Sequence, residues 1–140
     1  MEPQPKSELR ALILVVERDP HVRALERFFL EEAGFAVDFA PDGRAALERA
    51  REMQPAILVS EILVPGLDGL SVCRALKKDP KTRDIAVLIF SILAAEERAR
   101  EAGADAYLRK PLNEMRLVES VRELVSRHQG TAPESRGRGL

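Results

Sequence analysis

Four short polar segments of this sequence carry side chains that could do chemistry together. Each follows an apolar run: Glu17-Arg18-Asp19 after 11–16, Ser60-Glu61 after 56–59, Ser91 after 85–90, and Lys110 shortly after 106–108. Together they supply carboxylates, hydroxyls and cations. No nucleophile–base pair and no glycine-rich loop that cradles phosphate is evident, so we do not expect a stand-alone enzyme.

The apolar runs themselves predict the elements that position these groups. The runs 11–16, 56–59 and 85–90 contain only aliphatic and aromatic residues, which is typical of strands buried on both faces of a parallel sheet. Residues 35–39 alternate between apolar and polar, which indicates an edge strand, and 106–108 forms a weaker fifth strand. In a sheet of this kind, ligands gather at the carboxyl ends of the strands, which is where the four segments fall.

Helical patterns separate the strands. Val22, Leu25, Phe28 and Phe29 recur at helical spacing, and Gly34 can end that helix in a left-handed conformation. Asp42 and Asp68 can cap the next two helices, a short one spans about 95–102, and the last begins at residue 113. Strand and helix alternate five times, so we expect an α/β fold with right-handed crossovers and helices on both sheet faces.

Composition narrows the class of protein further. The 140 residues are 45% hydrophobic and 32% charged, with a net charge of −1, which favours one domain without general affinity for nucleic acid or membranes. The apolar runs are too short for a membrane span or a signal peptide, so we expect a cytoplasmic protein. Cys73 cannot form an internal disulfide, and with only His21 and His128 it cannot build a usual zinc site.

Both ends differ in composition from the centre. Residues 1–8 are polar with two prolines and predict a disordered arm, and the domain is expected to span 9–128. Residues 129–140 are polar and glycine-rich, which predicts a flexible tail or the stump of a linker to an output domain.

Two longer motifs identify a resemblance. It is carried by Pro65-Gly66-Leu67-Asp68-Gly69 and by 103–111, together with Glu32-Ala33-Gly34-Phe35. Through these segments, the chain resembles the receiver domain of two-component response regulators. The resemblance covers residue 11 to about residue 127. It implies a flavodoxin-like doubly wound fold, with five parallel strands in the order 2-1-3-4-5, two helices on one face and three on the other.

The resemblance also implies a phosphoryl-accepting site. Its acidic pair, which holds Mg²⁺ in the family, falls on Glu17 and Arg18, and its phosphoacceptor falls on Glu61. The positions that contact phosphate fall on Ser91 and Lys110. The position of the aromatic residue that moves on activation in the family falls on Tyr107.

Two of these positions depart from the family. Glu61 is one methylene longer than aspartate, and small misplacements in phosphoryl transfer can cost about a hundredfold in rate, so we expect the acceptor to be disabled. Its longer arm could instead reach Lys110 or Ser91, as phosphoryl oxygens would. Arg18 cannot ligate Mg²⁺, so we expect the metal site to be lost and no cofactor to bind. We also expect Arg18 to pair with Glu61.

These departures favour a pseudo-receiver: a signalling module of a bacterial two-component or phosphorelay pathway that binds a protein partner without phosphorylation. The resemblance places the partner, which could be a kinase, an output protein or a second copy, on the face formed by 95–102, 106–108 and the last helix, or on the first helix. One alternative is a domain that is still phosphorylated, at Glu61 or Ser60. Another is the regulatory half of a transcription factor whose DNA-binding domain is absent from these residues.

Overall fold

The central element is a five-stranded parallel sheet. The computed structural model describes residues 10–111 and 114–138, with side chains described as far as Arg127 in the last helix. The strands are β1 (Leu12–Val16), β2 (Ala36–Ala40), β3 (Ile57–Ser60), β4 (Ala86–Ser91) and β5 (Ala106–Arg109). Their order is β2-β1-β3-β4-β5, as the resemblance implied, and all neighbouring pairs run parallel.

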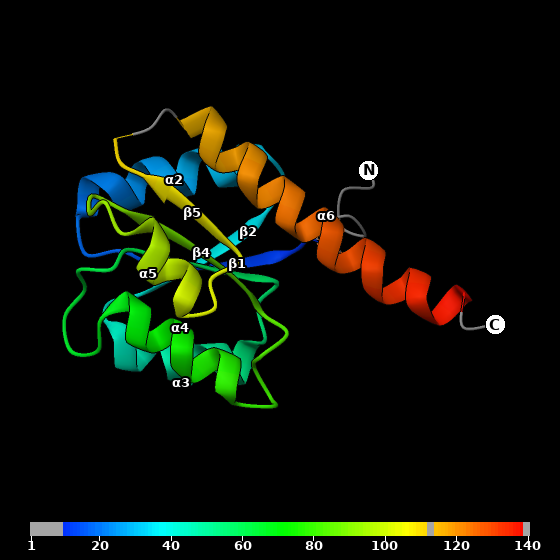
Figure 1. Ribbon diagram of the computed structural model, residues 1–140. Coiled ribbons are helices and arrows are strands. Elements are labelled where there is room, and N and C mark those ends of the chain that lie inside the picture. Colours follow the sequence, from blue (N-terminus) through cyan, green and yellow to red (C-terminus); the bar gives the residue numbers. More distant parts are fainter. Residues whose placement is uncertain (1–9, 112–113, 139–140) are drawn as a thin grey trace.

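Helices cover both faces of this sheet (Figure 1). They are α2 (Pro20–Glu32), α3 (Gly43–Met53), α4 (Gly69–Lys78), α5 (Glu96–Glu101) and α6 (Glu114–Arg138). Helices α2 and α6 lie together on one face, and α3, α4 and α5 lie on the other. The sheet therefore has two separate apolar cores, as expected for strands buried on both faces.

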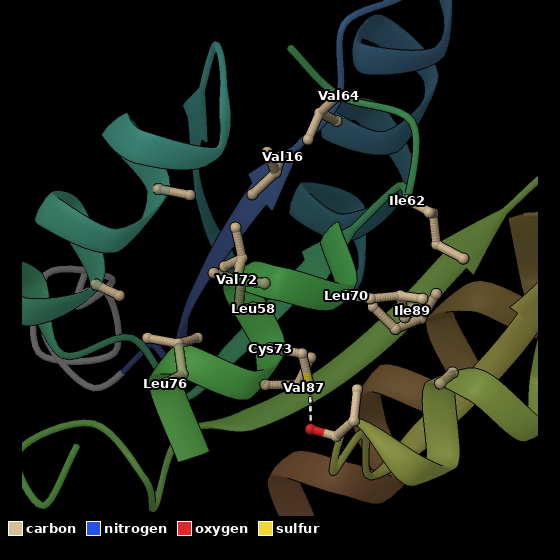
Figure 2. Packing of buried hydrophobic residues seen from close by; sticks show 14 of the residues in the cluster. Val16, Leu58, Ile62, Val64, Leu70, Val72, Cys73, Leu76, Val87 and Ile89 are labelled. Atoms are coloured by element: carbon tan, nitrogen blue, oxygen red, sulfur yellow. Dashed lines mark hydrogen bonds between the residues drawn. The ribbon is translucent and has the colours of Figure 1, made fainter. Parts of the chain in front are cut away.

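Figure 2 shows the core beneath α3, α4 and α5. Val16 of β1, Leu58 of β3 and Val87 and Ile89 of β4 meet Leu70, Val72, Cys73 and Leu76 of α4 there. Cys73 is fully buried, and its Sγ donates a hydrogen bond to the carbonyl oxygen of Ala102 at 3.4 Å. Cys73 thus behaves as a small buried side chain of the core.

Side-chain caps fix where the helices begin. Asp42 and Asp68 each accept a backbone hydrogen bond three residues onward, at 2.8 and 2.9 Å, which confirms both predicted caps. Asp19 caps α2 in the same manner by accepting from the amide of His21. Gly34 adopts a φ of 100° directly after α2, as predicted for a left-handed helix end.

One boundary differs from the sequence prediction. The sequence predicts an unpacked tail from residue 129, whereas α6 continues as a helix to Arg138 and extends beyond the sheet (Figure 1). Gly130, Pro133 and Gly137 are poor helix formers, so composition argues against a helix here, but extending an existing helix is far easier than starting one. The predicted arm 1–8 lies outside the described residues and stays a prediction.

Candidate functional site

The four polar segments meet at one edge of the sheet. Glu17 follows β1, Glu61 follows β3, Ser91 ends β4, and Lys110 follows β5. The strand register aligns these ends, because Val16 pairs with Ser60 and Ser60 pairs with Ile89. Glu17, Glu61 and Ser91 are 3%, 5% and 0% exposed, so the sheet edge holds a buried polar cluster.

Glu61 is the centre of this cluster. Its Oε2 accepts hydrogen bonds from the Ser91 hydroxyl and from the backbone amides of Ile62 at 2.7 Å and Leu63 at 3.3 Å. Its Oε1 accepts from Lys110 Nζ at 3.1 Å and from the Ile92 amide at 3.3 Å. The carboxylate therefore reaches both positions that contact phosphate in the family, which agrees with the longer arm expected from the sequence.

Lys110 joins the two buried acids. Its Nζ lies 2.6 Å from Oε1 of Glu17 and 3.1 Å from Oε1 of Glu61, and it stands 5.1 Å from the centre of the Phe90 ring. Burial disfavours the charged amine, but the hydrogen bonds and negative charges of Glu17 and Glu61 outweigh it and raise the pKa of Lys110. The ammonium is thus held between two carboxylates.

The pKa of Glu61 reflects the same competition between burial and pairing with opposite charge. Burial alone would raise it. The hydrogen bonds from Ser91 and Lys110, together with the positive charge of Lys110, outweigh burial and lower the pKa below its usual value. Glu61 is therefore an ionised carboxylate at neutral pH.

Arg18 does not take the role predicted for it. The sequence predicts a two-bond pair between Arg18 and Glu61, but Arg18 is exposed, and among the described residues Glu61 makes its ion pair with Lys110 instead. The reason is local: the ammonium of Lys110, whose side chain is 11% exposed, already pairs with Glu61, and the Asp19 cap begins α2 directly after Arg18. Arg18 instead lines, with Glu17 and Glu61, a cavity of about 250 Å³.

A chain of hydrogen bonds connects Glu61 to Tyr107. The Ser91 oxygen, which donates to Glu61, also accepts from the Leu93 amide at 3.1 Å. The Tyr107 hydroxyl donates to the Leu93 carbonyl oxygen and accepts from the Ala95 amide at 3.2 Å. The half-buried Tyr107 therefore fastens the segment between β4 and α5 that Ser91 begins.

Ser60, the alternative phosphoacceptor, points away from this chemistry. Its side chain is fully buried, and its hydroxyl donates at 2.8 Å to the carbonyl oxygen of Glu61. A phosphodonor cannot reach this oxygen without the strand end opening.

Sequence reasoning missed one buried acid, Glu26 of α2. It is 3% exposed, and burial, followed by the negative charge of Glu17, raises its pKa to about 8. Val22, Glu26 and Leu30 are spaced four residues apart and therefore share one helix face, and Leu30 is fully buried. That spacing was the available signal, but the apolar stripe predicted from the sequence runs through Leu25 and Phe28, which are 48% and 57% exposed.

A doubly wound sheet in this order, with an acid, a hydroxyl and a lysine at the carboxyl edge, defines the class of flavodoxin-like signalling domains. Residues 13–122 match the response regulator receiver domain family. The chain belongs to that family.

Several similar proteins of known sequence are transcription regulators. The chain is 34% identical over 118 residues to the DNA-binding dual master transcriptional regulator RpaA of Synechocystis, covering 82% of this chain and 49% of RpaA. It is 36% identical over 132 residues to the transcriptional regulatory protein CseB of Streptomyces coelicolor, covering 91% and 55%. The chain thus spans about half the length of these relatives.

Solved structures agree on the fold. The signal receiver domain of a signal transduction histidine kinase from Syntrophus aciditrophicus superposes with a TM-score of 0.77 at 33% identity, covering 83% of this chain and 90% of that one. The chemotaxis response regulator CheY4 of Vibrio cholerae gives a TM-score of 0.77 at 23% identity, covering 82% and 98%. Among the described residues, no helix has the length and apolar character needed to span a membrane.

Proposed function

We propose that this receiver domain works as a protein-interaction module whose conformation does not depend on phosphorylation. The observation that carries the proposal is the placement of the Glu61 carboxylate, which engages the Ser91 hydroxyl and the Lys110 ammonium together. In the family these two positions contact the phosphoryl group. Glu61 therefore supplies permanently the negative charge that phosphorylation supplies in relatives, and the domain is not an enzyme.

The donor set does not fit the family's Mg²⁺. The carboxylates of Glu17 and Glu61 both lie within ion-pair distance of the Lys110 ammonium, and the second acidic position holds Arg18. Magnesium prefers several oxygen ligands in near-octahedral geometry, and a guanidinium supplies none. The proposed domain therefore works without a metal or other cofactor.

The conformation of the segment after β4 follows from the same contacts. Glu61 holds Ser91, Ser91 holds the Leu93 amide, and Tyr107 holds the Leu93 carbonyl. In the family the corresponding aromatic ring moves inward when the hydroxyl engages phosphate. We therefore assign this domain the activated arrangement of that segment.

The proposed partner is a protein: a kinase, an output protein or a second copy of this chain. It would bind the face formed by α5, β5 and α6, where the segment held by Tyr107 lies, or the outer face of α2. Leu25 and Phe28 are 48% and 57% exposed on α2, which supports the second surface. With a net charge of −1, neither nucleic acid nor a membrane surface is a proposed partner, and the proposed location is the cytoplasm.

Intact-mass measurement after incubation with acetyl phosphate and Mg²⁺ tests this proposal. The wild-type protein should keep its mass, because Glu61 is occupied and the metal site is lost. A gain of one phosphoryl mass, mapped to Glu61 or Ser60, would instead support a domain that is still phosphorylated.

A designed variant provides the positive control. The double substitution R18D/E61D restores the acidic pair and the aspartate acceptor while leaving Ser91 and Lys110 in place. It should gain a phosphoryl mass under the same conditions, which shows that the donor and the fold are competent. The single variant E61D should gain little, because Arg18 still occupies the second acidic position.

A second candidate function is favoured by the named relatives. RpaA and CseB are transcription regulators about twice as long as the matched segment. In this alternative the domain is the regulatory half of such a protein, and the finding of a DNA-binding domain encoded in frame after residue 140 would support it.

A further inference from the structure

A second cavity lies between α2, β4 and the start of α6, behind Lys110. Its volume is about 200 Å³, and the side chains of the described residues that line it are apolar except for one carboxyl and one ammonium group. The lining residues that matter here are Val22, Leu25, Glu26, Phe90, Lys110 and Leu117. An apolar cavity with a few polar groups is the usual form of a small-molecule site.

Among the described residues, Glu26 is the polar group of this cavity without a hydrogen-bond partner. It is 3% exposed, and its Oε1 makes no hydrogen bond with any described residue. A buried acceptor without a hydrogen bond raises the free energy of the folded protein. A ligand donor that enters the cavity and bonds to Oε1 removes that cost, which favours binding.

The surrounding charge favours a cationic donor. Glu17, Glu61 and Lys110 are the charged groups whose fields act on Glu26 from the other elements. Lys110 is already paired with Glu17 and Glu61, at 2.6 and 3.1 Å. Three carboxylates and one ammonium leave a net negative charge when Glu26 is ionised, which attracts a cation and repels an anion.

We propose that this cavity is a binding site for a small organic amine. The ammonium group of the ligand bonds to the Glu26 carboxylate, and its apolar body contacts Val22, Leu117 and the Phe90 ring. A cavity of about 150 Å³ lined by apolar side chains can hold a benzene ring. The present cavity therefore has room for one ring with a short aminoalkyl arm.

The site shares a wall with the Glu61 cluster. Val22 and Lys110 line both this cavity and the cavity above Glu17 and Glu61. An amine on Glu26 stands beside Lys110, so binding should also change the environment of the Lys110 amide.

Titration with benzylamine, followed by ¹H–¹⁵N NMR at pH 8.5, tests the proposal. We expect saturable shifts at the amides of Leu25, Glu26, Phe90, Lys110 and Leu117. Benzyl alcohol, which has the same ring without the charge, should bind at least tenfold more weakly, because charge-assisted hydrogen bonds are about twice as strong as neutral ones. Absence of saturable shifts, or equal binding of amine and alcohol, would overturn the proposal.

Two variants localise the effect. Glu26→Gln should weaken benzylamine binding at least tenfold, whereas Glu32→Gln, which changes an exposed acid at the end of α2, should leave it unchanged. Leu25→Trp places a larger side chain at the half-exposed rim of the cavity and should also weaken benzylamine binding. This variant tests the site independently if E26Q disturbs the fold. Wild-type affinity in both cavity variants would place the amine elsewhere and refute the site.

Discussion

Glu26 and Lys110 are ionisable side chains in the interior, Glu26 buried and Lys110 largely buried, but among the described residues only Lys110 is paired with side chains of opposite charge. Lys110 lies between two carboxylates and stays ionised, whereas Oε1 of Glu26 has no hydrogen bond to any described residue and the pKa of Glu26 is raised to about 8. The cost of burying a charge depends on such partners, so substitution of the two residues should have opposite effects on stability.

Replacing Glu26 with Gln should stabilise the protein at alkaline pH. The pKa of Glu26 is raised from 4.5 to about 8, so between these values the folded state holds a proton that the unfolded chain has lost. Wild-type stability therefore falls as pH rises through this window. Urea unfolding should show E26Q to be more stable by about 2–4 kcal/mol at pH 8.5, and by much less at pH 5. The same stability difference between E26Q and wild type at pH 5 and pH 8.5 would contradict the raised pKa of Glu26. E32Q, which changes an exposed acid of the same helix, is the matched control.

Replacing Lys110 with Met should have the opposite effect. The variant leaves the buried carboxylates of Glu17 and Glu61 without their cation, which should cost about 3 kcal/mol in the free energy of unfolding at pH 7. The pKa of Glu61 lies below 4.5 in the folded protein, so the contribution of its pairing is present above pH 4.5 and is lost as pH falls through that lowered value. The difference from wild type should thus shrink in acid.

An exposed lysine serves as the control for this measurement. Lys78→Met at the end of α4 removes the same charge from a solvated position and should change stability by less than about 0.5 kcal/mol. If K110M lowered the free energy of unfolding no more than K78M does, the pairing of Lys110 with Glu17 and Glu61 would not stabilise the fold.

At the scale of elements, close backbone contacts position the loop that carries Glu61. Gly69 begins α4 against the backbone of Glu61 and Ile62, and Gly43 begins α3 against Leu67. A Cβ at either glycine would overlap a backbone carbonyl oxygen, of Glu61 or Leu67 respectively. The loop after β3 is therefore clamped between the starts of two helices, which explains how a longer side chain at position 61 is held in one place.

The segment between β4 and α5 depends on one hydroxyl. Tyr107→Phe removes the bonds to Leu93 and Ala95 and leaves the ring in place, so it should destabilise the domain by about 1 kcal/mol. Hydrogen exchange should quicken at the Leu93 and Ala95 amides but not in β1 or β3. Unchanged exchange at both amides would mean that Tyr107 does not fasten this segment.

Much of the fold could be predicted from the sequence because local signals agreed with one another. The continuous apolar runs gave the strands, and Asp42 and Asp68 marked two helix starts. The orientation of Arg18 could not be predicted. Sequence spacing indicates which residues follow a strand, but it does not determine which of two nearby cations pairs with a given carboxylate. Glu26 was missed because an acid on a helix is ordinarily solvated.

At the scale of the whole molecule, the domain keeps the receiver scaffold while the charges at its carboxyl edge are satisfied internally. The Lys110 ammonium is paired with both Glu17 and Glu61, so one cation serves two carboxylates at this edge. In the proposed function, this scaffold presents a fixed conformation to its protein partners.

Titration of the wild-type protein with Mg²⁺, followed by ¹H–¹⁵N NMR, tests this account most directly. We predict no saturable shift at the amides of Glu17, Glu61 or Ile92 up to tens of millimolar Mg²⁺, with R18D/E61D responding in the same range. Saturable shifts at these amides in the wild-type protein, lost in E61A, would show that Glu61 leaves Lys110 to bind the metal, and would contradict the account.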